Sequence, residues 1–399
     1  MIANIGGGAL MWAVHFLTGF LKEGQYGNFG VFLAVLMLLP NIPLQMVLSQ
    51  QTARALATNS VRELSGIIRM FLMGTGLVWL IGSIVTLYFQ KDILAHWKMS
   101  DPSGLWITLL IVLVAVWVPI FWGVLQGQQN FLWLGWSMLA SAFGRFSVAA
   151  IAVIILTAGA AGMMAGVLLG FVFALGVAAW HTRRLWLVPP QKFERRALLR
   201  QVIPMLVAFV GFQILFTADT ILVKDYFSKF DADYYVGAGT LSRALLWLVL
   251  PLASVMFPRL VHSDTKSEKS NLMGAVLLGT AVLSIVGALG LALVGPYVVP
   301  LLPGAFRTYA PQISGLLPWY GAAMVPLALS NVLLNQLLAR PDSKLSLAAF
   351  VLIAAIGYLF ALHFFHTRPV TVLQVMGAAN LVLLGICAIF FLRKKPQAT

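Results

Sequence analysis

Three charged residues lie inside otherwise long and apolar stretches of the chain: Arg145, Asp219 and Arg243. A charge at the centre of a membrane-spanning helix costs about 2.5–3.5 kcal/mol on insertion scales, so such a residue usually faces a protein interior or a wet cavity. Arginine binds phosphate oxygens through paired N–H donors and keeps its charge when desolvated. Two interpretations follow: a structural Asp219–Arg243 pair, or arginines that line a cavity and attract a phosphate.

Depth within the predicted helices separates the three residues. At 1.5 Å per residue, Arg145 lies about 21 Å from the inner end of its helix, beyond the midplane. Arg243 lies about 11 Å, and Asp219 about 5 Å, from the outer ends of their helices. Because these two helices are consecutive and antiparallel, the Arg243 side chain can reach Asp219. The intramembrane amides Gln45 and Asn335 hydrogen-bond either a sugar or a neighbouring helix, and they join the three charges as candidate substrate-binding residues.

No pattern of a soluble enzyme occurs. The six histidines are scattered without an HExxH motif, and no Walker A or dinucleotide-binding context is present. His15 is interpreted as a helix-contact histidine rather than a proton relay. Cys387 is the single cysteine, so no internal disulfide can form. We therefore expect neither an enzyme nor a bound metal or cofactor.

The composition is that of a polytopic membrane protein. Of the 399 residues, 60% are hydrophobic and 10% charged, against about 25% charged in soluble domains. Mean hydropathy is +0.93. The net charge of +14 is interpreted as basic residues that hold inner loops on the cytoplasmic side, not as a nucleic-acid surface. The apolar run after Met1 has no basic residues before it, so no cleavable signal peptide is expected.

A spanning helix needs about 20 mostly apolar residues, and this rule predicts about twelve spans. They are 2–21, 29–49, 70–90, 105–125, 131–156, 160–180, 202–222, 236–257, 272–294, 313–338, 345–362 and 371–392. With the N-terminus inside, most of the 26 Lys and Arg residues fall in inner segments, so both termini are predicted to be cytoplasmic. Pro40 and Pro43 are predicted to kink the second span, and Pro251 the eighth.

The most basic loop, 181–201, divides the chain. Pro189 and Pro190 stop any continuous helix there, and the following segment is suited to the membrane surface. The loop is interpreted either as a site of substrate capture or as a topological anchor and linker. We predict an N-terminal six-helix lobe (1–182), a basic cytoplasmic linker (183–201) and a C-terminal six-helix lobe (202–399). A weak internal repeat, with 23–26 matching 231–234, agrees with two lobes.

Several segments carry a family resemblance. They are TADTILVKDYF (217–227), DADYYVGAGTLSRALLWLVLPLASVMFPRL (231–260), LLPWYGAAMVPLALSNVLLNQLLAR (316–340) and YGNFGVFLAVLMLLPNIPLQMVLSQQTARAL (26–56). Together they resemble the polysaccharide-biosynthesis flippases, the O-antigen and oligosaccharide-lipid branch of the multidrug/oligosaccharidyl-lipid/polysaccharide (MOP) exporter superfamily. The similarity covers essentially the whole chain, although its motifs are diffuse.

The resemblance implies a fold and a function. It implies an all-α protein of two six-helix lobes around a central cavity, in a bacterial inner membrane. Such a protein moves a polyprenyl-pyrophosphate-linked glycan, for example a lipopolysaccharide O-antigen unit, from the inner to the outer leaflet by alternating access. Cavity cations of that family are thought to meet the pyrophosphate, and the matching positions are Arg145 and Arg243, with Asp219 as acidic partner.

Two other functions are also compatible with the sequence. They are a cation-coupled small-molecule or drug antiporter of the same superfamily, and a non-transporting membrane scaffold. The predicted N-terminal lobe has no acid within a span, whereas cation-coupled drug exporters of the superfamily commonly carry one there. The glycan, the coupling ion and the oligomeric state do not follow from the sequence.

Overall fold

The computed structural model describes residues 7–8, 10, 12–262, 266–339 and 344–392. The first part of the predicted span 2–21 lies outside these residues, as do both ends of the chain. The cytoplasmic location of the termini stays a prediction. Throughout the described part the secondary structure is helical, without strands, which confirms the all-α prediction. Within these described ranges, ten helices are long and apolar enough to cross a membrane, and each coincides with a predicted span. The predicted span 236–257 lies within a further helix, α10 (Lys229–His262). The chain is thus a multi-pass membrane protein.

The helices cluster into two compact units, Met1–Phe209 and Val210–Thr399, called unit 1 and unit 2 below. This confirms the two-lobe organisation. The boundary between the units falls inside one continuous helix, α9 (Arg195–Tyr226). The basic residues from Arg195 onward are therefore the first turns of a spanning helix rather than a separate surface segment. The exact limits predicted for the lobes and the linker stay predictions.

Unit 1 contains the N-terminal half of α9 and the elements that precede it. These are η1 (Val14–Phe20), α2 (Gln25–Met37), α3 (Asn41–Ala57), α4 (Val61–Tyr88), α5 (Gln90–His96), α6 (Ser103–Gly127), α7 (Phe131–Ala150), the π-helical η2 (Ile151–Ile155) and α8 (Gly159–Trp186). The second predicted span is interrupted between α2 and α3, at Pro40. Proline lacks a backbone N–H, and the residue before it avoids helical geometry, so the break lies where the kink was predicted.

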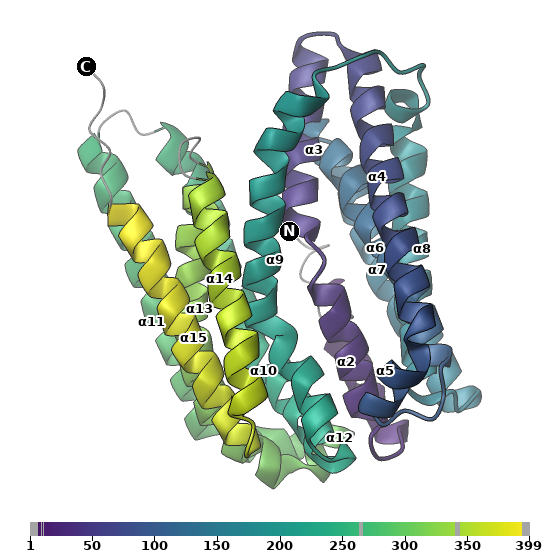
Figure 1. The fold of residues 1–399 in the computed structure, drawn as a ribbon, viewed down its shortest axis with the longest axis vertical. Coiled ribbons are helices and arrows are strands. Elements are labelled where there is room, and N and C mark those ends of the chain that lie inside the picture. The colour runs from purple at the N-terminus through teal and green to yellow at the C-terminus, as the bar shows by residue number, and fades with distance from the viewer. Residues whose placement is uncertain (1–6, 9, 11, 263–265, 340–343, 393–399) are drawn as a thin grey trace. The chain divides into compact units, whose positions relative to one another are not determined.

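Small residues set the packing of α7 on α8, which lie side by side in Figure 1. Gly162, Gly166 and Gly170 recur every four residues and share one face of α8. A Cβ on Gly166 would lie 2.6 Å from the carbonyl oxygen of Arg145, and one on Gly170 would lie 2.5 Å from that of Ser141. Only glycine permits this approach, because the two backbones are nearly in contact. The backbone around Arg145 is therefore fixed against α8.

The chain between α8 and α9 is fastened to α4 and forms the strap, residues 187–194. The guanidinium of Arg69 donates hydrogen bonds of 3.3 Å to the carbonyl oxygens of Trp186, Leu187 and Val188. The Ser65 hydroxyl donates to Trp186 and Val188. These bonds satisfy carbonyl groups that a helix end leaves without partners. The strap consequently has a defined path over unit 1 despite its two prolines.

Unit 2 contains the C-terminal half of α9, followed by α10. The later elements are α11 (Lys266–Val298), η3 (Val299–Leu301), α12 (Ala305–Thr308), α13 (Ala310–Ala339), α14 (Lys344–Phe364) and α15 (Pro369–Leu392). Helix α13 is the most buried of the ten candidate spans and packs against α10, α11 and α15. Figure 1 shows α13 and α15 as neighbours, and the Asn380 amide of α15 donates a 2.8 Å hydrogen bond to the Ala323 carbonyl of α13.

Candidate functional site

Asp219 and Arg243 form a buried ion pair in unit 2. The Arg243 Nη2 group lies 2.7 Å from both carboxylate oxygens of Asp219. The same nitrogen donates to the Thr220 hydroxyl at 2.8 Å, and Nε donates to the Phe216 carbonyl at 3.1 Å. The Asp219 side chain is fully buried, and that of Arg243 is 11% exposed. The contact predicted between these two residues is confirmed, whereas their role in substrate binding stays a prediction.

Two tyrosines complete the surroundings of the Asp219 carboxylate. Tyr235 of α10 donates to Oδ2 at 2.9 Å, and Tyr320 of α13 donates to the same oxygen at 2.5 Å. Both rings are fully buried. The Arg243 guanidinium also lies over the Tyr320 ring, 5.4 Å from its centroid, which is within cation–π range. A buried charge needs this many partners to offset the water that it loses.

The Arg243 guanidinium keeps one amino group outside this network. Its Nη1 forms no hydrogen bond with any residue that the structure describes. Gly239, one turn earlier on α10, leaves room beside it. A Cβ at that position would lie 2.7 Å from Nη1 and 2.8 Å from the Tyr320 hydroxyl. Nη1 therefore has two N–H donors available for a further acceptor.

Arg145 has a different environment in unit 1. It lies on α7 and is half-buried. Its Nε is buried and has no hydrogen-bond partner among the described residues, and no ion pair of Arg145 occurs there. A buried donor without a partner is costly, so it needs an explanation such as an unfilled ligand site. Of the two intramembrane arginines, Arg145 has the larger unmet capacity for an anion.

The other candidate residues make ordinary contacts between or within helices. The Gln45 amide donates to the Gln126 side chain at 3.1 Å, which joins α3 to α6. The Asn335 amide donates to the carbonyl and side-chain oxygens of Asn331, one turn earlier on α13. His15 is buried, with its Nδ1 3.0 Å from the Tyr26 hydroxyl, which agrees with a helix-contact histidine. Substrate contacts of Gln45 and Asn335 stay predictions.

Sequence reasoning missed the residues that surround the ion pair. Thr220, Tyr235 and Tyr320 carry no motif, and Tyr320 is 101 residues from Asp219 along the chain. The one available signal for Thr220 was its position next to Asp219. Within the described residues, no group of three or more potential metal ligands occurs. The guanidinium groups of Arg145 and Arg243, the second of them held by a buried carboxylate, have N–H donors that can bind an anion.

The comparison with protein families decides the class. The model of the family described as polysaccharide biosynthesis protein matches residues 9–264, more than half of the chain. The chain belongs to this family. The match includes Arg145, Asp219 and Arg243, and it confirms the resemblance stated from the sequence. No curated protein sequence matches this member of the family.

Solved structures with the same fold are transporters. An inward-facing multidrug resistance MATE family transporter of the MOP superfamily superposes with a TM-score of 0.72 at 13% identity, covering 98% of this chain and 96% of the other. The lipid II flippase MurJ gives 0.71 at 15% identity, with coverage of 99% and 87%. A eukaryotic MATE transporter gives 0.68 at 13% identity, with coverage of 98% and 95%. This family member thus has the transporter fold of the MOP superfamily.

Proposed function

We propose that the protein is a flippase for a lipid-linked oligosaccharide, which moves a polyprenyl-pyrophosphate glycan from the inner to the outer leaflet by alternating access. The polysaccharide-biosynthesis family and the fold shared with a lipid flippase support this assignment over a soluble enzyme. A bacterial inner membrane, with O-antigen or a related lipopolysaccharide glycan as the cargo, suits such a role.

The observation that carries the proposal is the unmet hydrogen-bonding capacity of Arg145. A half-buried guanidinium whose buried Nε has no hydrogen-bond partner among the described residues suits a passing phosphate group. Arginine binds phosphate oxygens bidentately, and it stays charged at any physiological pH. Arg243 offers its Nη1 in the same way, while Asp219 neutralises it between transport cycles. A cationic drug would be repelled by such a donor.

The test compares glycan delivery to the outer leaflet by Arg145→Gln, Arg145→Lys and the parent protein. Arg145→Gln is expected to lower delivery about 10- to 100-fold, since a hydrogen bond to a charged group contributes about 1.5–3 kcal/mol. Arg145→Lys keeps the charge but not the planar fork, so its glycan delivery is expected to lie between that of Arg145→Gln and that of the parent protein. Lys91→Gln, an exposed position on α5, removes the same charge elsewhere and serves as control.

Membrane insertion and thermal stability of every variant are measured alongside delivery. Full delivery by Arg145→Gln would remove this residue from the mechanism. Drug sensitivity of a deletion strain whose surface glycan is normal would instead favour the antiporter of the same superfamily. If all variants fold, glycan delivery is unchanged and the deletion strain is not drug-sensitive, a non-transporting scaffold would be favoured.

A further inference from the structure

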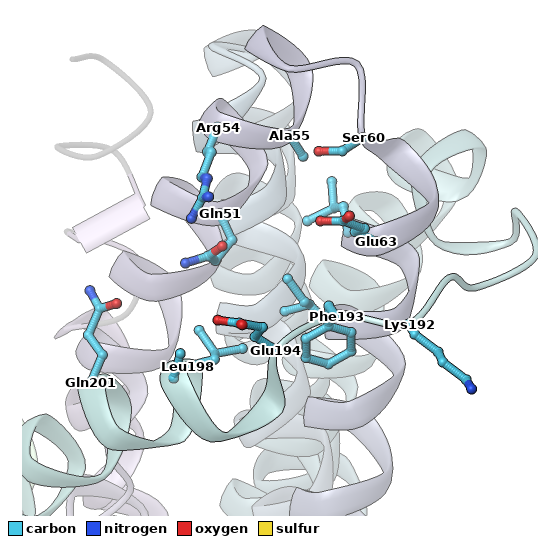
Figure 2. A pocket seen from close by; sticks show the side chains of 13 residues that line it. Gln51, Arg54, Ala55, Ser60, Glu63, Lys192, Phe193, Glu194, Leu198 and Gln201 are labelled. Atoms are coloured by element: carbon cyan, nitrogen blue, oxygen red, sulfur yellow. The ribbon is translucent and has the colours of Figure 1, made fainter.

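Unit 1 contains a cavity whose lining includes none of the candidate substrate-binding residues. It has a volume of about 480 Å³, within the range of about 300–1,000 Å³ typical of small-molecule pockets. The end of α3, the start of α4, the strap and the start of α9 line it, as Figure 2 shows. Neither Arg145 nor Gln45 lines it.

Six polar side chains with ionic or amide groups line this cavity. They are Gln51, Arg54, Glu63, Lys192, Glu194 and Gln201. None of them forms a side-chain hydrogen bond or an ion pair with another residue in the described ranges. In Figure 2 the Lys192 ammonium points away from the other polar groups. The cavity therefore presents one guanidinium, two carboxylates and two amides that are free to bind a ligand.

The walls of the cavity are held in place before any ligand arrives. The Gln191 backbone N–H donates to the Arg62 carbonyl of α4 at 3.0 Å, which fixes the strap beside the cavity. A Cβ on Gly66 would lie 3.2 Å from the Phe193 ring and 2.9 Å from the Gln191 carbonyl, so strap and helix are in close contact. Phe193 and Glu194 thus start from a fixed backbone, which lowers the entropy lost on binding.

The donors and acceptors define the class of ligand. A carboxylate only accepts hydrogen bonds, an amide donates and accepts, and a guanidinium only donates. Sugar hydroxyls can donate to the carboxylates and bond with the amides, and a phosphate can accept charge-assisted hydrogen bonds from the guanidinium. Phe193 adds an apolar face. We propose that this cavity binds a phosphorylated sugar, with Arg54 at the phosphate and Glu63 and Glu194 at the hydroxyls.

This inference deepens the proposed function, since a phosphorylated sugar is the head of the proposed cargo. The same chemistry has a second source, a soluble nucleotide sugar. A site for the membrane-anchored glycan would load the substrate, whereas a site for a nucleotide sugar would sense the supply of precursor. The experiment has an arm for each source.

Binding is measured by ligand-observed NMR on the purified full-length chain, with glucose 1-phosphate as the probe. Glucose and inorganic phosphate are expected to bind at least several-fold more weakly than the probe. Arg54→Gln is expected to lower affinity for the probe about tenfold or more and to leave glucose unchanged. The double variant Glu63→Gln/Glu194→Gln is expected to bind both the probe and glucose more weakly than the parent does. Arg62→Gln, next to Glu63 but outside the cavity, is the matched control and should bind as the parent does.

Two competitors identify the source. Displacement of the probe by nanodiscs that contain polyprenyl-phosphate-linked glucose, but not by empty nanodiscs, supports a loading site. Displacement by UDP-glucose alone supports a precursor sensor. No saturable binding of the probe, or equal binding by Arg54→Gln and the parent, would overturn the inference. So would preferential binding of a polyamine through the two carboxylates.

Failure of the inference and failure of the proposed function are distinguishable. Arg145→Gln leaves every lining residue of the cavity in place and should bind the probe normally while it loses glycan delivery. Probe binding that depends on Arg54 in a protein that delivers no glycan would reject only the flippase. Glycan delivery by a protein that binds no probe would reject only the sugar-phosphate cavity.

Discussion

Tyr320 donates a 2.5 Å hydrogen bond to the Asp219 carboxylate, although 101 residues separate the two in sequence. The bond joins α13 to α9, while the ion pair with Arg243 joins α10 to the same carboxylate. Asp219 is therefore the point at which three helices of unit 2 are connected by charge-assisted hydrogen bonds. Such bonds are about twice as strong as neutral ones, so the carboxylate contributes to packing as well as to the charge of the site.

The first prediction separates the partnered from the unpartnered tyrosines. Tyr320→Phe deletes a donor to a buried carboxylate and is expected to cost about 1.5–3 kcal/mol of stability. Tyr358→Phe is the matched control, because its hydroxyl is buried without a partner among the described residues. Its removal should be neutral or stabilising. Thermal melting of the purified proteins checks both. Equal destabilisation by the two substitutions would contradict the assigned hydrogen bonds.

The second prediction concerns the ion pair. Asp219→Asn leaves Arg243 buried without a counter-charge and is expected to destabilise the protein by about 3–5 kcal/mol. Adding Arg243→Gln removes the orphaned charge, so the double variant should recover part of the folded protein. Size-exclusion profiles and melting curves measure both effects. Additive losses in the double variant would argue against pairing, and a well-folded Asp219→Asn protein without transport would point to proton transfer by Asp219.

The spans were predictable because each depends only on about 20 consecutive apolar residues. The contact of Asp219 with Arg243 was also within reach, because consecutive antiparallel helices bring such charges together. Tyr320 was out of reach, since its meeting with Asp219 depends on how α13 packs, which no local pattern encodes. The cavity was equally hidden, because its lining combines the consecutive helices α3 and α4 with the strap and the start of α9, which lie far from them in sequence.

The third prediction tests the space beside the free amino group of Arg243. Gly239→Ala places a methyl group within 3 Å of both Arg243 Nη1 and the Tyr320 hydroxyl. Overpacking of this kind costs about 1–3 kcal/mol, and it also covers the donor proposed for phosphate. Gly274→Ala on α11 has open space around the new methyl and serves as control. Melting temperature and glycan delivery should both fall for Gly239→Ala alone. Unchanged values would show that the guanidinium moves aside without consequence.

The fourth prediction concerns the helix contact that positions Arg145. Gly170→Ala would bring a Cβ within 2.5 Å of the Ser141 carbonyl and 3.0 Å of the Arg145 backbone nitrogen, neither of which can rotate away.

Because α7 must move outward, the expected cost is about 1–3 kcal/mol, accompanied by lower glycan delivery. Gly176→Ala, which lies on α8 as Gly170 does, meets nothing within 4 Å and should leave both stability and glycan delivery unchanged. Thermal melting and delivery, measured on the two variants together, check this contrast. Identical behaviour would mean that the α7–α8 approach is looser than the structure indicates.

The fifth prediction addresses the strap. Arg69→Gln removes the donors to the carbonyls of Trp186, Leu187 and Val188, so the strap should detach from α4 more often. Local opening exposes backbone to proteases, and trypsin should cut within 183–196 at least several-fold faster. Arg62→Gln on the same helix keeps its backbone carbonyl, the acceptor of the Gln191 N–H, and should be cut at the parental rate. Limited proteolysis followed by mass spectrometry measures the rates. Because Phe193 and Glu194 line the cavity, a detached strap should also weaken binding of glucose 1-phosphate, whereas faster cleavage with full binding would show that the strap does not shape the site.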